Sequence, residues 1–304
     1  MRALILGLVL LTAGCDDAPS RDLARQETRE PVWRLTGLAD PESVALAADG
    51  RTLYVANVAG EGDVKDGNGF VSRVSIGGKM LQRAWVTGLD APKGAVVSGG
   101  KLYVSDIDNL VEIDTAAGKI VARYPAPGAT FLNDVGVAPD GTVLVADSGT
   151  GRIFALQGGA MVVWSADPLL KSVNGLLPEA ERLLVTTMEG KLLAIDYRTR
   201  ASKVLADGLG LADGIARADG DNYFVSEWPG RLFYVRPGGK AATVMDTRAG
   251  GVYINDFIRV GDLLIAPNWK PGALTAYRMV TMMLTDAGGA AEADLPAHLQ
   301  RALL

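Results

Sequence analysis

Six polar residues recur along the chain at intervals of about forty to fifty residues, each just before a short run of small or apolar residues. Five of the six carry side-chain oxygen atoms, and four of these, Glu42, Asn133, Asn174 and Asp213, offer two carboxylates and two amide oxygens. Carboxylate and amide oxygens are the donors that calcium, magnesium and manganese prefer, and they suit zinc less well. The set therefore predicts a divalent cation site, with Ca²⁺ as the expected ion and Mg²⁺, Mn²⁺ or Zn²⁺ as the alternatives.

The two remaining residues of the series are Lys93 and Asn255. A lysine beside the cluster would repel a cation, or would pair with Glu42 and take the place of the metal. Alternatively, it could point outward and hold an anionic carboxylate of a substrate. Lys93, Asn133 and Asn255 are therefore the candidate substrate-binding residues.

A purely structural explanation also exists for most of the series. Asn and Asp commonly open strands through hydrogen bonds from their side chains to the backbone, and Asn-Asp, Asn-Gly and Asp-Gly are turn dipeptides in many proteins. That explanation accounts for Asn133, Asn174 and Asp213, but not for Glu42 in the same register.

Positioning such a series requires a repeated unit, and the sequence contains one. Short apolar strands ending in a small residue recur at 53–56, 102–105, 143–146, 183–186, 223–226 and 263–266. The first interval is longer than the others because residues 58–69, VAGEGDVKDGNG, form an insertion rich in Gly and Asp. Third strands are expected at 71–75, 110–114, 152–156, 191–195, 231–235 and 273–277, and fourth strands follow in most units.

A four-stranded unit repeated about every forty residues is typical of a β-propeller blade. The last unit has no clear fourth strand, but VWRLTGL at 32–38 closely matches AWVTGL at 84–89, the fourth strand of the first unit. The expected fold is therefore an all-β, six-bladed β-propeller over residues 31–283, with its last blade closed by the N-terminal strand. A β-solenoid is the alternative, although its repeats are usually shorter. Residues 284–304 are expected to form a tail with a short helix.

The hairpin in each unit determines where the polar residues gather. Because a hairpin returns the chain, the start of the first strand and the end of the second lie at one edge. The series from Glu42 to Asn255 should therefore collect near the axis on one face, and the 58–69 insertion could cover the opening. The second strands end in an outer polar ring, which comprises Asn57, Asp106, Asp147, Thr187, Glu227 and Asn268.

The ordered set Pro41-Glu42-Ser43, Asn133-Asp134, Asn174-Gly175 and Asp213-Gly214 resembles the gluconolactonase/regucalcin (senescence marker protein) family over about residues 31–280. The resemblance implies that Glu42, Asn174 and Asp213 bind a divalent metal and that Asn133 contacts substrate or metal. It also implies that Asp213 is the general base. Diisopropyl fluorophosphatase and paraoxonase are similar propellers, and these relatives hydrolyse lactones or phosphoesters.

Several other chemistries are excluded by composition. The lone histidine, His298, lies outside every repeat, which disfavours a Ser-His-Asp triad. The lone cysteine, Cys15, excludes an internal disulfide and a cysteine-based metal cluster. The net charge of -5 offers no basic stripe for nucleic acid.

The N-terminus reads as an export signal. Met1-Arg2 precedes an apolar run over 3–11, and Leu-Thr-Ala-Gly-Cys at 11–15 resembles the lipobox of bacterial lipoproteins. The resemblance implies a signal peptide at 1–14, lipidation of Cys15 and a polar tether at 15–30; an ordinary signal peptide with an incidental cysteine is the alternative. The expected location is membrane-anchored, facing the periplasm or the cell surface.

These observations predict an exported, lipid-anchored, metal-dependent hydrolase of the gluconolactonase type that cleaves a lactone or related ester. The alternative is a non-catalytic periplasmic propeller that binds a ligand or a protein partner, because a fold does not establish a function. In either case the expected partner is a small molecule or protein rather than nucleic acid, and a monomer is expected.

Overall fold

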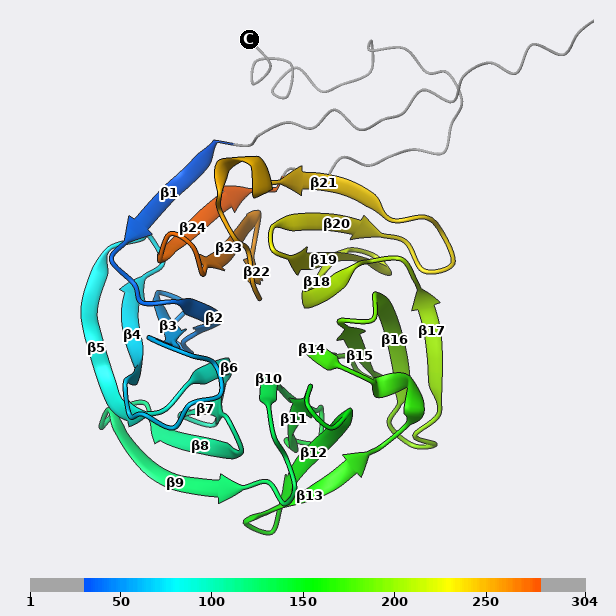
Figure 1. The fold of residues 1–304 in the computed structure, drawn as a ribbon, viewed down its shortest axis with the longest axis horizontal. Coiled ribbons are helices and arrows are strands. Elements are labelled where there is room, and N and C mark those ends of the chain that lie inside the picture. Colours follow the sequence, from blue (N-terminus) through cyan, green and yellow to red (C-terminus); the bar gives the residue numbers. More distant parts are fainter. Residues whose placement is uncertain (1–29, 280–304) are drawn as a thin grey trace, which may run out of the picture.

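The computed structural model describes residues 30–279, which form six four-stranded antiparallel sheets around a central axis (Figure 1). This arrangement confirms the all-β six-bladed propeller, and the solenoid alternative is wrong because the sheets close into a ring. The predicted signal peptide, the lipidation site Cys15, nearly all of the tether and the C-terminal tail with its expected helix lie outside the described residues.

The first five blades run outward from the axis in chain order, and in the sixth the outermost strand is the first strand described. The innermost strands are β2 (Pro41–Leu46), β6 (Pro92–Ser98), β10 (Leu132–Val137), β14 (Val173–Pro178), β18 (Leu211–Asp219) and β22 (Ile258–Val260). The second strands are β3 (Thr52–Asn57), β7 (Lys101–Asp106), β11 (Val143–Asp147), β15 (Arg182–Thr187), β19 (Asn222–Trp228) and β23 (Leu263–Asn268). The third strands are β4 (Gly69–Ser75), β8 (Asn109–Asp114), β12 (Arg152–Gln157), β16 (Lys191–Asp196), β20 (Arg231–Val235) and β24 (Ala273–Arg278).

The outermost strands are β5 (Met80–Leu89), β9 (Lys119–Pro125), β13 (Ala160–Ser165), β17 (Ser202–Ala206), β21 (Ala242–Asp246) and β1 (Pro31–Thr36). Two short 3₁₀ helices, η1 (Pro168–Leu170) and η2 (Arg248–Gly250), occur in connections. The innermost strand of the sixth blade, β22, is short, since its regular pairing begins only at Ile258. No helix among residues 30–279 has the length and hydropathy needed to cross a bilayer.

The ring closes as the sequence predicts. Strand β1 pairs antiparallel with β24, with Arg34 opposite Thr275 and Leu35 opposite Leu274. It thereby supplies the outer strand of the sixth blade (Figure 1) and covers an edge that would otherwise expose unpaired backbone groups.

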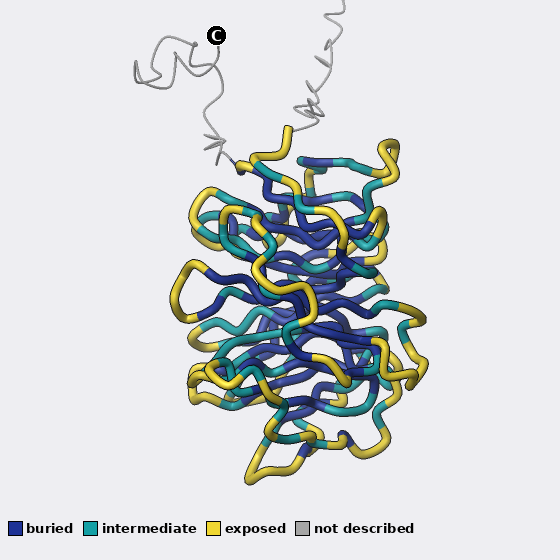
Figure 2. The backbone as a smooth tube through the Cα atoms, turned by 90° about the vertical axis from the view of Figure 1, so that its left-hand side faces the viewer, coloured by how far each residue is buried: buried dark blue, intermediate teal, exposed yellow. Residues whose placement is uncertain are grey.

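Burial on both faces explains why the second strands are almost continuously apolar. Every residue of β3 and β11 is buried, whereas the outermost strand β9 alternates between exposed and half-buried positions. The inner strands pack between neighbouring sheets, as where Leu144 and Ile153 meet Leu176. Figure 2 shows the result, with buried segments through the middle of the disc and exposed turns on its flanks.

The predicted outer ring of polar residues has a structural role. Its members are fully or almost fully buried, and in the first, second, third and sixth blades they bind the backbone of the chain that enters the blade. Asn57 accepts from the amide of Ala39 at 3.1 Å, and Asp147 accepts from the amide of Phe131 at 2.9 Å. These side chains fix the loops that lead into the innermost strands.

Candidate metal and substrate site

The predicted site residues lie where the innermost strand of each blade departs from regular pairing. In the first five blades the register against the second strand shifts across these positions. In β2, Pro41 pairs with Asn57 and Val44 pairs with Val55, so Glu42 and Ser43 occupy the interruption. Bulges of this kind re-aim side chains, and here they allow residues such as Glu42 to face the central channel.

Hydroxyl groups fix the backbone of these bulges from the neighbouring blade. Ser43 Oγ donates to the carbonyl oxygen of Lys93 at 2.5 Å, and Ser148 Oγ donates to that of Val173 at 2.5 Å. Equivalent bonds run from Ser105 to the carbonyl of Asn133 and from Thr186 to the carbonyl of Asp213. Each bond joins one blade to the next, so the site backbone is held by the ring as a whole. Sequence reasoning missed this role, although Ser105 and Thr186 occupy equivalent positions in the repeat.

Glycine follows the site residue in three blades because the next blade approaches too closely for a side chain. A Cβ at Gly175 would lie 2.3 Å from the carbonyl oxygen of Asp213, and one at Gly94 would lie 2.5 Å from that of Asn133. The Asn174-Gly175 and Asp213-Gly214 dipeptides look like turn signals in the sequence, but here the glycines are required by the close packing of neighbouring blades around the channel.

The structure brings all six residues of the series to one cavity of about 290 Å³. Each of them is at most 6 % exposed, and the full set is Glu42, Lys93, Asn133, Asn174, Asp213 and Asn255. Gly62 from the 58–69 insertion also lines this cavity, so the insertion reaches the mouth of the channel as expected.

Two oxygen atoms of this cluster are buried without a hydrogen-bond partner. They are Oε2 of Glu42 and Oδ1 of Asn255. A buried acceptor without a donor costs free energy, about 1–3 kcal/mol for a neutral group and more for a charged one. Asn133 uses its amide nitrogen to donate to Ser148 Oγ at 3.2 Å, which leaves its carbonyl oxygen available. The site therefore has more oxygen acceptors than donors, and a cation that prefers oxygen ligands would bind the unpaired acceptors.

The donor set is mixed. Among residues 30–279 no three His, Cys, Asp or Glu side chains form a metal-binding group. A cation at this point would therefore rest on the carboxylates of Glu42 and Asp213 together with amide oxygens, a combination that calcium accepts.

Burial strongly affects the acids of the site. Burial and the nearby Asp134 charge raise the pKa of Asp213 to about 7, although hydrogen bonding by Asn174 opposes the shift. Burial, followed by the charge of Asp213, raises the pKa of Glu42 well above its ordinary range, and Lys93 partly offsets the rise. A bound cation would counteract both effects by stabilising the ionised forms.

The Lys93 ammonium bonds to backbone carbonyl groups at the edge of the cavity. Its Nζ donates to the carbonyl oxygens of Gly62 at 2.5 Å and Ala91 at 3.2 Å, and it lies 4.2 Å from the ring centroid of Phe131. The ammonium leaves Oε2 of Glu42 without a partner, so Lys93 does not replace a metal by direct pairing. Burial lowers the pKa of Lys93, and the charge of Glu42 opposes that shift.

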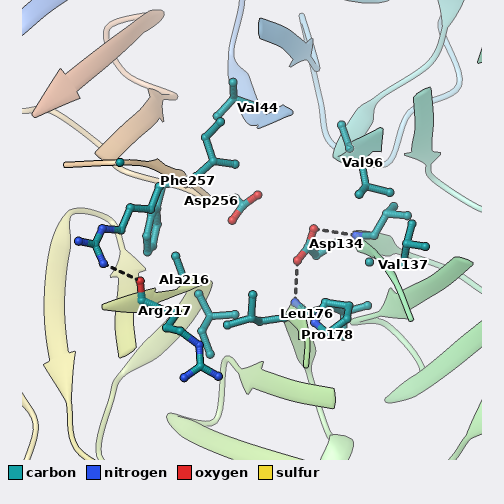
Figure 3. A pocket seen from close by; sticks show the side chains of 18 residues that line it. Val44, Val96, Asp134, Val137, Leu176, Pro178, Ala216, Arg217, Asp256 and Phe257 are labelled. Carbon is teal, nitrogen blue, oxygen red and sulfur yellow. Dashed lines mark hydrogen bonds between the residues drawn. The ribbon is translucent and has the colours of Figure 1, made fainter. Parts of the chain in front are cut away.

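A second cavity of about 690 Å³ lies further along the innermost strands, and Asp134 and Asp256 project into it (Figure 3). Asp134 accepts from the amides of Val135 at 2.7 Å and Leu176 at 2.6 Å. Burial raises the pKa of Asp134 to about 7, and burial together with the charges of Asp134 and Asp213 raises that of Asp256 well above its usual range. Neither acid was predicted to be a site residue. Their position directly after Asn133 and Asn255 in the series is the signal that could have indicated them.

No protein-family model matches the chain, and no curated protein matches it in sequence. Among solved structures, the fold is similar to selenomethionine-substituted virginiamycin B lyase from Staphylococcus aureus, with a TM-score of 0.59 and 11 % identity, covering 82 % of this chain and 99 % of that one. The same lyase in a catalytically inactive histidine-to-alanine form with quinupristin gives a TM-score of 0.58, 10 % identity and the same coverage.

The extracellular domain of a proposed hybrid two-component system from B. thetaiotaomicron gives a TM-score of 0.54 and 14 % identity, covering 78 % of this chain and 34 % of that one. Together these similarities define the class of this protein as a six-bladed β-propeller. The histidine that matters to the lyase has no equivalent residue type in the propeller, because His298 is the only histidine of the chain.

Proposed function

We propose that this chain is an exported, lipid-anchored hydrolase of the gluconolactonase type, which requires a divalent cation and cleaves a lactone or related ester. Glu42, Asn174 and Asp213, with help from Asn133, would hold the cation, and Ca²⁺ is the expected ion. The observation that carries the proposal is the pair of buried, unpartnered oxygens, Glu42 Oε2 and Asn255 Oδ1, in one cavity with Asp213.

When bound, the cation would polarise the carbonyl group of the substrate and stabilise negative charge on its oxygen. The remaining chemistry belongs to side chains of the chain. The Asp213 carboxylate, whose pKa burial raises to about 7, is suited to accept a proton from an attacking water at neutral pH. Asn133 and Asn255 would orient the substrate through their amide groups, and Lys93 adds positive charge at the edge of the cavity.

The N-terminal features complete the proposal. Lipidation of Cys15 would tether the propeller to a membrane, where the catalytic face meets small substrates on the periplasmic side or at the cell surface. Replacing Cys15 by Ser should release the protein from the membrane fraction and prevent labelling with radioactive palmitate. Labelling of that variant at the level of the unaltered protein would rule out the anchor.

A panel of lactones and phosphotriesters, assayed on the full chain with calcium and with chelator, tests the catalytic proposal. We expect calcium-dependent opening of at least one lactone, and a loss of that activity when chelator is added. Hydrolysis that is insensitive to metal removal, or a complete lack of turnover across the panel, would refute it.

A non-catalytic binding propeller is the second candidate. It is favoured by the ammonium group of Lys93, a fixed positive charge that lines the same cavity and opposes cation binding. A propeller of similar fold is also the extracellular domain of a proposed hybrid two-component system, which is consistent with a binding role. Binding of a small anion that chelator leaves unchanged, together with inactivity on the panel, would favour this second candidate.

A further inference from the structure

The cavity that holds the oxygen cluster is polar at its floor and apolar along its walls. The floor consists of buried carboxylate and amide groups such as Glu42 and Asp213. The side chains above them are apolar and half-buried, and these are Phe131, Met188, Trp228 and Trp269. A ligand that reaches the floor must therefore lie against an aromatic and thioether surface.

Contacts among the wall residues hold the aromatic rings in place. Trp228 packs edge-to-face against Trp269, with ring centroids 6.3 Å apart at 88°, and against Tyr253, at 5.2 Å and 76°. Phe131 is held on the other side, where the ammonium of Lys93 lies 4.2 Å from its ring centroid. Because these rings are already ordered, little conformational entropy is lost when a flat apolar group packs against them.

The walls offer few hydrogen-bond partners for hydroxyl groups. The charged group of Lys93 lies against Phe131, and its Nζ is already bonded to the carbonyl oxygens of Gly62 and Ala91. A ligand hydroxyl placed against Met188 or Trp269 would lose its bonds to water without replacing them. A polyhydroxylated sugar lactone therefore suits these walls poorly.

We propose that the substrate is a lactone or ester with an aromatic or other compact apolar body, which packs against Trp228, Trp269 and Met188 while its carbonyl group faces the oxygen cluster. This inference rests on the proposed hydrolytic function, and it departs from the sugar-lactone preference that the family resemblance would suggest. The cavity volume of about 290 Å³ lies at the small end of ligand pockets, which favours a substrate of one or two rings.

The test compares dihydrocoumarin, an aromatic lactone, with glucono-δ-lactone on the full chain in the presence of calcium. We expect kcat/KM to be about tenfold or more higher for dihydrocoumarin. Met188→Gln, which preserves side-chain length while adding an amide to the wall, and Trp269→Phe should each raise KM for dihydrocoumarin several-fold with little change in kcat. Trp164→Ala, which removes an indole from the outermost strand of the third blade, serves as the matched control and should leave KM unchanged.

Equal or greater efficiency with glucono-δ-lactone would overturn the inference, as would an equal effect of the wall variants on both lactones. If the protein hydrolyses no compound of the lactone and phosphotriester panel, the proposed function is wrong, and the selectivity of the cavity is then measured by equilibrium binding. Binding of dihydrocoumarin that Met188→Gln weakens, without binding of glucono-δ-lactone, would still support an apolar ligand. Binding of neither compound, or preferential binding of the sugar lactone, would reject it.

Discussion

The ammonium nitrogen of Lys93 donates a 2.5 Å hydrogen bond to the carbonyl oxygen of Gly62, which joins the innermost strand of the second blade to the insertion of the first. The insertion is also held by Lys65, whose Nζ lies 2.6 Å from a carboxylate oxygen of Asp108. Lys93 thus places a positive charge in the site and fixes one wall of its opening.

Replacing Lys93 by Met should have two separable effects. Calcium affinity should rise by about tenfold, because removing a nearby like charge favours cation binding by an amount of order 1 kcal/mol. The 58–69 insertion should be cut faster by protease, because it loses the hydrogen bond at Gly62. Calcium titration and limited proteolysis measure the two effects, and Lys101→Met, which removes a partly exposed lysine paired with Asp114, provides the control. Weaker calcium binding in Lys93→Met would show that Lys93 supports the cation site.

Asp213→Asn should keep the fold and lower turnover by about 10²–10⁴-fold, because the amide cannot accept the proton of an attacking water. Circular dichroism checks the fold, and lactone hydrolysis at saturating substrate measures turnover. Asp207→Asn, an exposed acid whose carboxylate lies 3.5 Å from Lys191 Nζ, is the matched control. Turnover by Asp213→Asn at the rate of the unaltered protein would remove Asp213 from the mechanism.

Calcium should raise the melting temperature of the protein, and chelator should reverse the rise. A ligand present at a hundredfold excess over its dissociation constant stabilises the folded state by about 2.7 kcal/mol. Glu42→Gln removes one of the two carboxylates of the cluster while preserving its shape, so this variant should lose most of the calcium-induced shift. Differential scanning calorimetry with and without calcium measures the effect, and an undiminished shift in Glu42→Gln would place calcium elsewhere.

The metal-free protein should become less stable as the pH rises toward neutrality. Burial raises the pKa of both Asp134 and Asp213 to about 7 in the folded state, whereas the unfolded chain releases these protons near pH 4. Between these values the folded state binds more protons, so the free energy of unfolding falls as the pH rises from about 4 to about 7 and then levels off.

The melting temperature without calcium should therefore be higher at about pH 5 than at about pH 8, and calcium should restore stability at the higher pH. Asp213→Asn should reduce the slope of the metal-free profile, because one of the two titrating groups is then absent. A metal-free profile that rises between the two pH values would contradict the assignment of these buried protons.

Gly175→Ala should destabilise the propeller, because its Cβ would lie 2.3 Å from the carbonyl oxygen of Asp213. Overpacking of this kind typically costs about 1–3 kcal/mol, and here it would also displace a site residue. Gly250→Ala is the control, since an added Cβ there meets no atom within 4 Å. Thermal unfolding of both variants makes the comparison, and equal melting temperatures would show that neighbouring blades can separate at Gly175 without cost.

The fold was predictable because two local signals agreed throughout the chain. Apolar runs such as 53–56 and 143–146 are buried on both faces of a sheet, so they appear in the sequence without alternation. The match between 32–38 and 84–89 was sufficient to predict the pairing of β1 with β24. The strand β17 escaped the pattern because it is only five residues long and two of its residues, Lys203 and Val204, are exposed.

The candidate site was predictable as a set of residues but not as an arrangement of atoms. Register alone brings Glu42 and Asn255 to one cavity, whereas the direction of the Lys93 side chain depends on a carbonyl group in the insertion. Asp134 and Asp256 were missed because a regular strand would turn consecutive side chains to opposite faces. The bulge that brings Asp134 to the channel beside Asn133 is a tertiary feature, set by packing against the next blade.

The pairing of β1 with β24 has a consequence for how the molecule is assembled. The first strand to be synthesised completes its blade only after the last strand has been made, so the ring stays open until the chain is nearly complete. Glu42 lies in the first blade and Asn255 in the sixth, and they meet across the junction that this late pairing seals. A chain that ends before β24 would leave β1 without its partner strand and the ring unclosed beside the site.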